Sequence, residues 1–82
     1  MPHIIVKLWK GKPEDKKRKL AEEIKKLTMD ILGTPESSIS LAFEETTPED
    51  WPLLVYGPDI LDKKETLYIE PGYVPDIFKK QG

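Results

Sequence analysis

Pro2 offers the most unusual chemistry in this sequence, because removal of Met1 would leave its backbone nitrogen as a free secondary amine. A free α-amine has a pKa near 8, and desolvation or neighbouring cations lower that value toward neutrality. Such an amine can accept a proton as a general base and return it. Because about one residue in twenty is proline, a Met-Pro start also arises by chance, and Pro2 needs support from the rest of the chain.

Most other residue sets that mark an enzyme are absent from the sequence. It contains one histidine, His3, and no cysteine, which excludes thiolate nucleophiles, disulfides and thiolate zinc sites. It has no glycine-rich phosphate-binding loop and no regular spacing of metal ligands. Glu44 and Glu45 alternate across a predicted strand and therefore cannot face the same substrate. We expect no metal site.

The composition indicates a small globular protein. The 82 residues are 38% apolar and 34% charged, which predicts one folded domain over residues 1–82. No run is long enough to span a membrane and no signal-peptide pattern is present, so we expect a cytoplasmic protein. The net charge of −2 provides no broad field for nucleic acid or anionic lipid, and small molecules are the expected ligands.

Two predicted strands flank one predicted helix in the first half of the chain. Residues 3–9 are rich in β-branched and aromatic types and alternate as a strand does. Pro13 is suited to begin a helix and Gly33 to end it, and residues 38–45 alternate again. The crossover of such a unit places its strands parallel. The sequence therefore predicts an α/β (α+β) fold with a β-α-β core over residues 2–45.

The apolar residues of this core are predicted to gather on defined faces. A sheet of two strands covered by one helix leaves its edges and its second face bare, which is costly in water. We therefore expect other copies of the chain to complete the sheet. The packed faces are predicted to hold Ile4, Val6 and Leu8 of the first strand, Leu20, Ile24, Leu27 and Ile31 of the helix, and Ile39, Leu41 and Phe43 of the second strand.

Residues 46–82 carry frequent prolines and are predicted to hold only short helices, turns and a C-terminal arm. Thr47 is placed to open a single helical turn over residues 48–51. Residues 59–67 suggest a short second helix. Residues 68–73 suit a short strand and turn.

Several short motifs occur together with these elements. They are Met-Pro-His-Ile at the start of the chain, Gly-Lys at 11–12, Ser-Ser-Ile-Ser at 37–40, Pro-Glu-Asp-Trp at 48–51 and Pro-Gly-Tyr at 71–73. In this pattern the chain resembles the 4-oxalocrotonate tautomerase superfamily, over residues 2–56 and again at 71–73. The resemblance is nearest to the short bacterial tautomerases that form dimers.

The resemblance implies a role for four residues. Members of the superfamily use an amino-terminal proline, here Pro2, as a general base that moves a proton between oxygen and carbon of an enol acid without a cofactor. Lys12 stands where the best-known member has an arginine, and it keeps a charge for a substrate carboxylate. Ser40 replaces a second arginine and is neutral. Trp51 would supply an aromatic wall that desolvates the amine and suits an aryl ligand.

Each of these residues also has a simpler interpretation. Lys12 could belong to a solvated basic stretch before the helix. Ser40 could face a partner sheet, and Trp51 could fill a core or an interface. His3 alternates away from Pro2 along the strand, so we do not expect it to relay a proton directly.

The sequence thus predicts a homo-oligomeric keto–enol tautomerase, dimeric rather than hexameric, that acts on a small 2-oxo or enol acid such as an arylpyruvate. Two alternatives stay open. One is a hydratase or hydrolytic dehalogenase of the same superfamily, in which a protonated proline is the acid; carboxylates beside the proline would favour it. The other is a non-catalytic oligomeric binding module, which a retained Met1 would favour.

Overall fold

The computed structural model describes residues 1–79. They form two compact units, Met1–Glu45 and a second that begins at Thr46, and each unit is described by itself below. The description of the whole chain as one domain stays a prediction.

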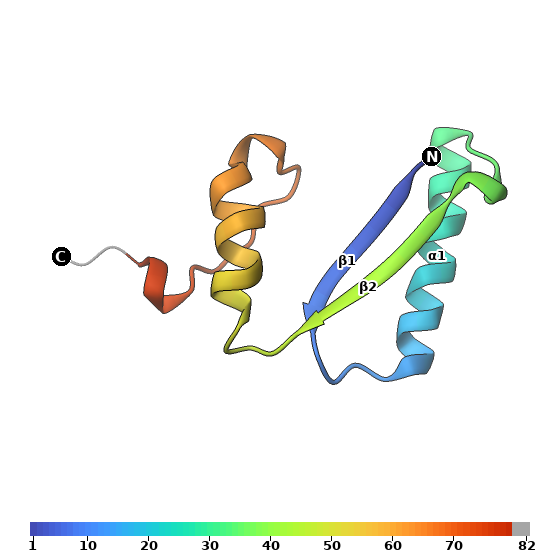
Figure 1. The fold of residues 1–82 in the computed structure, drawn as a ribbon. Helices are drawn as coiled ribbons and strands as arrows, with labels where there is room; N and C mark the ends of the chain where they lie inside the picture. The colour runs from blue at the N-terminus through green and yellow to red at the C-terminus, as the bar shows by residue number, and fades with distance from the viewer. Residues whose placement is uncertain (80–82) are drawn as a thin grey trace. The chain divides into compact units, whose positions relative to one another are not determined.

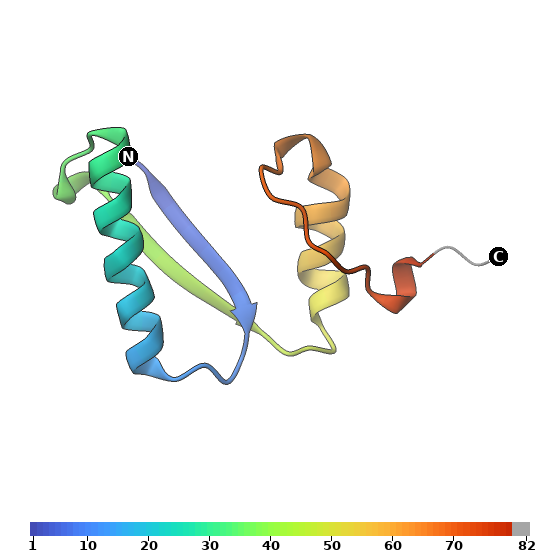
Figure 2. The same cartoon turned by 180° about the vertical axis from the view of Figure 1, so that it is seen from behind.

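The first unit is a β-α-β arrangement, as the sequence predicted (Figure 1). Strand β1 (His3–Trp9) leads to helix α1 (Glu14–Leu32), and the chain returns through strand β2 (Ser40–Thr46). The strands are neighbours in a two-stranded parallel sheet. Figure 2 shows the unit from behind, with α1 lying along one face of the sheet.

Pro13 precedes helix α1 and Gly33 follows it, and each residue suits the end of the helix at which it lies. The carbonyl of Pro13 accepts hydrogen bonds from the amides of Lys16 and Lys17, both at 3.2 Å. Gly33 follows the helix with a φ of 67°, and its amide donates to the carbonyl of Met29 at 3.0 Å. This left-handed conformation strains most side chains, so a glycine there ends the helix.

Strand β2 begins two residues later than the sequence suggested. Residues Glu36–Ser38 form a 3₁₀ turn, η1. The amide and the hydroxyl of Ser38 both donate to the carbonyl of Pro35, at 3.1 and 3.0 Å. These local bonds compete with strand pairing, and the ladder therefore starts at Ser40.

Each face of the sheet carries its own ion pairs. On the face toward α1, the ammonium of Lys17 lies 2.6 Å from the carboxylate of Glu45 and 3.2 Å from that of Glu14. These two hydrogen-bonded carboxylates, Glu45 foremost, raise the pKa of Lys17 above its usual value. On the opposite face, Lys7 of β1 lies 3.9 Å from Glu44 of β2. Because side chains alternate along a strand, His3 and Ser40 share the face with Lys7 and Glu44.

The first unit has no fully buried side chain among its residues. Ile31 of α1 is 76% exposed and Leu27 is 57% exposed, although both belong to the predicted apolar stripe. On the face of β1 away from α1, Ile5 and Trp9 are each about half exposed. The apolar surface of this unit therefore exceeds what one helix and two strands can bury.

The second unit is built from short helical segments. Thr47 opens a turn by accepting the amide of Asp50 on both its carbonyl and its hydroxyl, at 3.1 and 3.2 Å, as predicted. A π-helical segment, η2 (Pro52–Ile60), and two 3₁₀ segments, η3 (Leu61–Thr66) and η4 (Asp76–Phe78), follow.

Two of the predictions for this region need correction. Most of the expected second helix at 59–67 is the 3₁₀ segment η3, and the longer helical segment η2 precedes it. The strand expected at 68–73 is absent: within residues 1–79 the sheet contains only β1 and β2. Pro71 lacks an amide for a ladder, and the neighbouring Tyr68 and Ile69 are exposed with nothing to pack against.

A small aromatic cluster holds the second unit together. Tyr56 is 5% exposed, and its ring centre lies 5.6 Å from those of Tyr73 and Phe78. Gly57 is buried beside it, and a Cβ at that position would lie 3.2 Å from the Phe78 ring and 3.3 Å from the carbonyl of Pro52. A side chain at Gly57 would therefore fit only if the Phe78 ring or the Pro52 carbonyl shifted by a few tenths of an ångström.

We predict that Gly57→Ala destabilises the second unit by about 1–3 kcal/mol, because the new methyl group overpacks this contact. The matched control is Gly72→Ala, since a Cβ at Gly72 meets nothing within 4 Å. Urea unfolding followed by tryptophan fluorescence measures both. Equal midpoints for the two variants would show that Gly57 is not tightly packed.

Candidate active site

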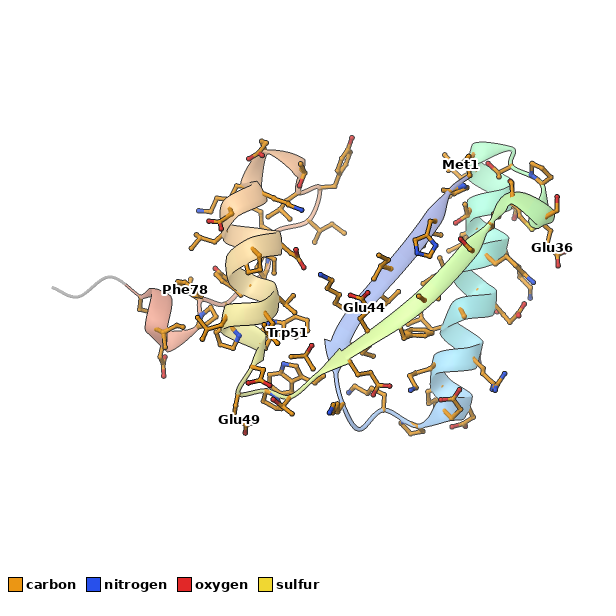
Figure 3. The ribbon with its side chains drawn as sticks, in the orientation of Figure 1. Met1, Glu36, Glu44, Glu49, Trp51 and Phe78 are labelled. Atoms are coloured by element: carbon orange, nitrogen blue, oxygen red, sulfur yellow. The ribbon has the colours of Figure 1, made fainter. Side chains whose placement is uncertain are left out.

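Pro2 lies at the start of β1 and is held against the start of β2. Its carbonyl accepts a hydrogen bond from the amide of Ser40 at 3.2 Å. The preceding Met1 donates from its ammonium to the carbonyl of Ser38 at 2.6 Å. Figure 3 shows Met1 at the end of the sheet where β2 begins. The chain is therefore held to the start of β2 on both sides of the Pro2 ring, and of these two bonds only the one from Ser40 to Pro2 does not involve Met1.

Ser40 lies beside this terminus and has a partner that the sequence did not predict. Its hydroxyl oxygen is 2.6 Å from Nδ1 of His3. The pairing follows from the register of the ladder. Because the Ser40 amide bonds to the Pro2 carbonyl, Ser40 lies opposite the next residue of β1, which is His3. From the sequence, His3 was not expected to relay a proton for Pro2, and Ser40 was not considered as the partner of His3.

Lys12 lies at the opposite end of β1, in the connection to α1. The seven residues of β1 at about 3.3 Å each separate the two ends by roughly 23 Å. Pro2 and Lys12 of one chain therefore do not reach the same small molecule. Lys12 borders a shallow apolar hollow of about 170 Å³, whose other lining residues are Leu8, Lys16, Lys17 and Leu20.

Trp51 belongs to the second unit, immediately before η2. It is partly buried, and its indole Nε1 donates to the hydroxyl of Tyr73 at 2.8 Å. Tyr73 in turn packs on Tyr56. The predicted aromatic wall is thus oriented by a tyrosine that sequence reasoning placed only in a turn motif, and no local sequence signal links residues 51 and 73.

Of the four predicted site residues, Pro2 and Ser40 are joined through their backbones, and Lys12 lies at the other end of β1. Residues 1–79 contain no group of three or more histidine, aspartate and glutamate side chains arranged to bind a metal. Over the same residues, every helix is too short or too polar to cross a lipid bilayer.

Comparison with known protein families places residues 2–57 in one of them. That stretch matches the family described as "Tautomerase enzyme". It contains β1, α1 and β2, together with Trp51 and the first turns of η2. The match therefore includes all four predicted site residues.

Two curated relatives extend the similarity over most of the chain. A probable tautomerase of Xylella fastidiosa is 44% identical over 73 residues, which cover 89% of this chain and 89% of the relative. Tautomerase PptA of Pectobacterium atrosepticum is 38% identical over 74 residues, which cover 89% of this chain and 97% of the relative.

Two solved structures share the fold. TomN, a 4-oxalocrotonate tautomerase homologue of the tomaymycin biosynthetic pathway, superposes with a TM-score of 0.60 at 29% identity, over 79% of this chain and 97% of TomN. The 4-oxalocrotonate tautomerase homologue TTHB242 gives a TM-score of 0.59 at 27% identity, over 62% and 81% of the two chains. The β-α-β unit described above is therefore the one found in this superfamily.

We predict that Tyr73→Phe lowers the free energy of unfolding by about 1 kcal/mol, because the Trp51 indole loses its acceptor. Tyr68→Phe is the matched control, since the Tyr68 side chain is exposed. Urea unfolding with tryptophan fluorescence compares the two variants. Identical stability and identical emission spectra would contradict a role for Tyr73 in orienting Trp51.

Proposed function

Because the chain belongs to the tautomerase enzyme family, we propose that it catalyses the keto–enol tautomerisation of a small 2-oxo acid, with the amine of Pro2 as general base. It is an isomerase of the 4-oxalocrotonate tautomerase superfamily. The hydrogen bond from the Ser40 amide to the Pro2 carbonyl, which holds Pro2 at the start of the sheet, is the observation that supports the proposal most.

The proposed reaction moves one proton and needs no cofactor. After removal of Met1, the neutral Pro2 nitrogen takes the proton from the enol hydroxyl, and the O–H electron pair forms the carbonyl bond. The carbon–carbon double bond opens toward the adjacent carbon, which receives a proton from the prolinium. Positioned acid–base transfer of this kind contributes about 10²–10⁴-fold to the rate.

The remaining site residues are proposed to bind the substrate. The ammonium of Lys12 would pair with the substrate carboxylate, and the hydroxyl of Ser40 would contact the oxygen that gains or loses the proton. Trp51 would provide a flat apolar surface for an aryl group. These three roles follow from the resemblance stated above and from the chemistry of each side chain.

The separation of Pro2 from Lys12 supports a site shared between copies. If both residues contact one substrate, Lys12 must come from another copy of the chain. The uncovered sheet face and the exposed apolar residues of α1 give such an association a hydrophobic driving force. We propose a homo-oligomer, with a dimer favoured over a hexamer, that works in the cytoplasm.

We predict that Pro2→Ala lowers kcat for ketonisation of an arylpyruvate enol by about 10²-fold or more, because a primary amine replaces the ring nitrogen and its fixed geometry. Removal of Met1 is verified by intact-mass measurement for both proteins. Circular dichroism serves as the control for folding. Equal rates for the two processed proteins would overturn the assignment of Pro2 as the base.

A further inference from the structure

We propose that His3 is a positioning residue for Ser40: its imidazole holds the Ser40 hydroxyl so that the hydroxyl proton is directed at the substrate oxygen beside Pro2. This inference rests on the proposed function and deepens it. Such positioning would let the neutral Ser40 hydroxyl donate a hydrogen bond where the superfamily's best-known member has a charged arginine.

The geometry of the pair is fixed by the backbone. Pro2 and Ser40 are joined by a ladder hydrogen bond of 3.2 Å, and His3 is the next residue of β1. Its Nδ1 lies 2.6 Å from the Ser40 hydroxyl oxygen, a short distance for a hydrogen bond that involves nitrogen. Both side chains are exposed, on the sheet face away from α1. Within a single chain the pair is thus open to solvent.

The pair determines what Ser40 offers to a ligand. A serine hydroxyl has one proton and two acceptor lone pairs. When Nδ1 carries a proton, the imidazole donates to the hydroxyl oxygen, and the hydroxyl proton is free to bind a ligand oxygen. When Nδ1 is bare, it accepts the hydroxyl proton, and a ligand meets only lone pairs. His3 thus decides whether Ser40 is a donor or an acceptor.

A tautomerase needs the donor state. Loss of the enol proton to Pro2 leaves negative charge on the substrate oxygen, and a preplaced donor stabilises that charge. In a chain from imidazole to hydroxyl to substrate, each hydrogen bond polarises the next. A donated bond from His3 therefore makes the Ser40 proton a stronger donor than an isolated serine would provide.

Other charged groups on this face lie further away. Lys7 and Glu44 stand four residues beyond His3 and Ser40 along their strands, or about 13 Å at the usual strand rise, and they contact each other at 3.9 Å. At the near end, the ammonium of Met1 is bound to the carbonyl of Ser38, and the proposed processing removes it. The imidazole is thus the side chain of this face that lies within hydrogen-bond distance of the Ser40 hydroxyl.

The test uses processed protein with Met1 removed and compares His3→Leu, Ser40→Ala and the double variant. We expect each single change to lower kcat for arylpyruvate enol ketonisation by about 10-fold, less than the 10²–10³ typical of removing a direct oxyanion donor. The KM should change little. Because the two residues act as a unit, the double variant should be no slower than either single variant.

Two further variants separate positioning from simple support of the strand. His3→Asn keeps a donor near the position of Nδ1 and should restore most of the lost kcat. Arg18→Gln alters an exposed polar side chain of α1, away from this face, and should leave kcat unchanged. A merely structural role would instead lower stability in His3→Leu and leave kcat of the folded protein intact, which would overturn the inference.

A spectroscopic readout tests the contact without reference to activity. The Nδ1 resonance of His3 should shift in Ser40→Ala, and it should shift in the wild type when phenylpyruvate is added. Unchanged resonances in both experiments would refute the pairing. If Pro2→Ala is as active as the wild type, the proposed function fails; if Pro2→Ala is slow but His3→Leu is not, only the present inference fails.

Discussion

The hydrogen bond between the Ser40 amide and the Pro2 carbonyl is the contact on which the proposed site depends. It fixes the first residue of the parallel ladder, and so it holds the ring of Pro2 at the end of the sheet. It also sets the register that places His3 opposite Ser40. Without it, the amino terminus would be a mobile tail, and a mobile amine is a poor general base.

Strand β1 begins next to Pro2 and separates Lys12 from it by the length of the strand. β1 runs from one end of the sheet to the other, so a cation in the connection to α1 cannot serve the amine of its own chain. A parallel strand pair with one helix also leaves one face uncovered. In the proposed association, a second copy covers the apolar surface and brings its own Lys12 to the first copy's Pro2. Stability and catalysis would then depend on the same association.

Much of the first unit could be predicted from the sequence, because its signals are local. Alternation identified the strands, and Pro13 and Gly33 marked the limits of α1. The start of β2 was misplaced because hydroxyl and amide bonds of Ser38 to Pro35 replace ladder bonds there. The short strand predicted within 68–73 did not form, since a strand also needs a neighbour to pair with.

The candidate site could be predicted only in part, because contacts between residues distant in sequence leave no local signal. Pro2 and Ser40 were proposed from their positions in a known pattern, in which Ser40 replaces an arginine, and their roles stay predictions. Their joint placement, and the addition of His3, depends on the register between two strands distant in sequence. The bond from Trp51 to Tyr73 likewise spans residues that no local pattern connects.

Complementation between copies tests the shared site most directly. The Pro2→Ala and Lys12→Ala proteins are mixed, unfolded, refolded together and assayed. In a symmetric dimer with a shared site, half of the dimers are mixed and each has one intact site, so about a quarter of the wild-type activity should return. Activity no higher than the mean of the two separate variants would contradict a shared site.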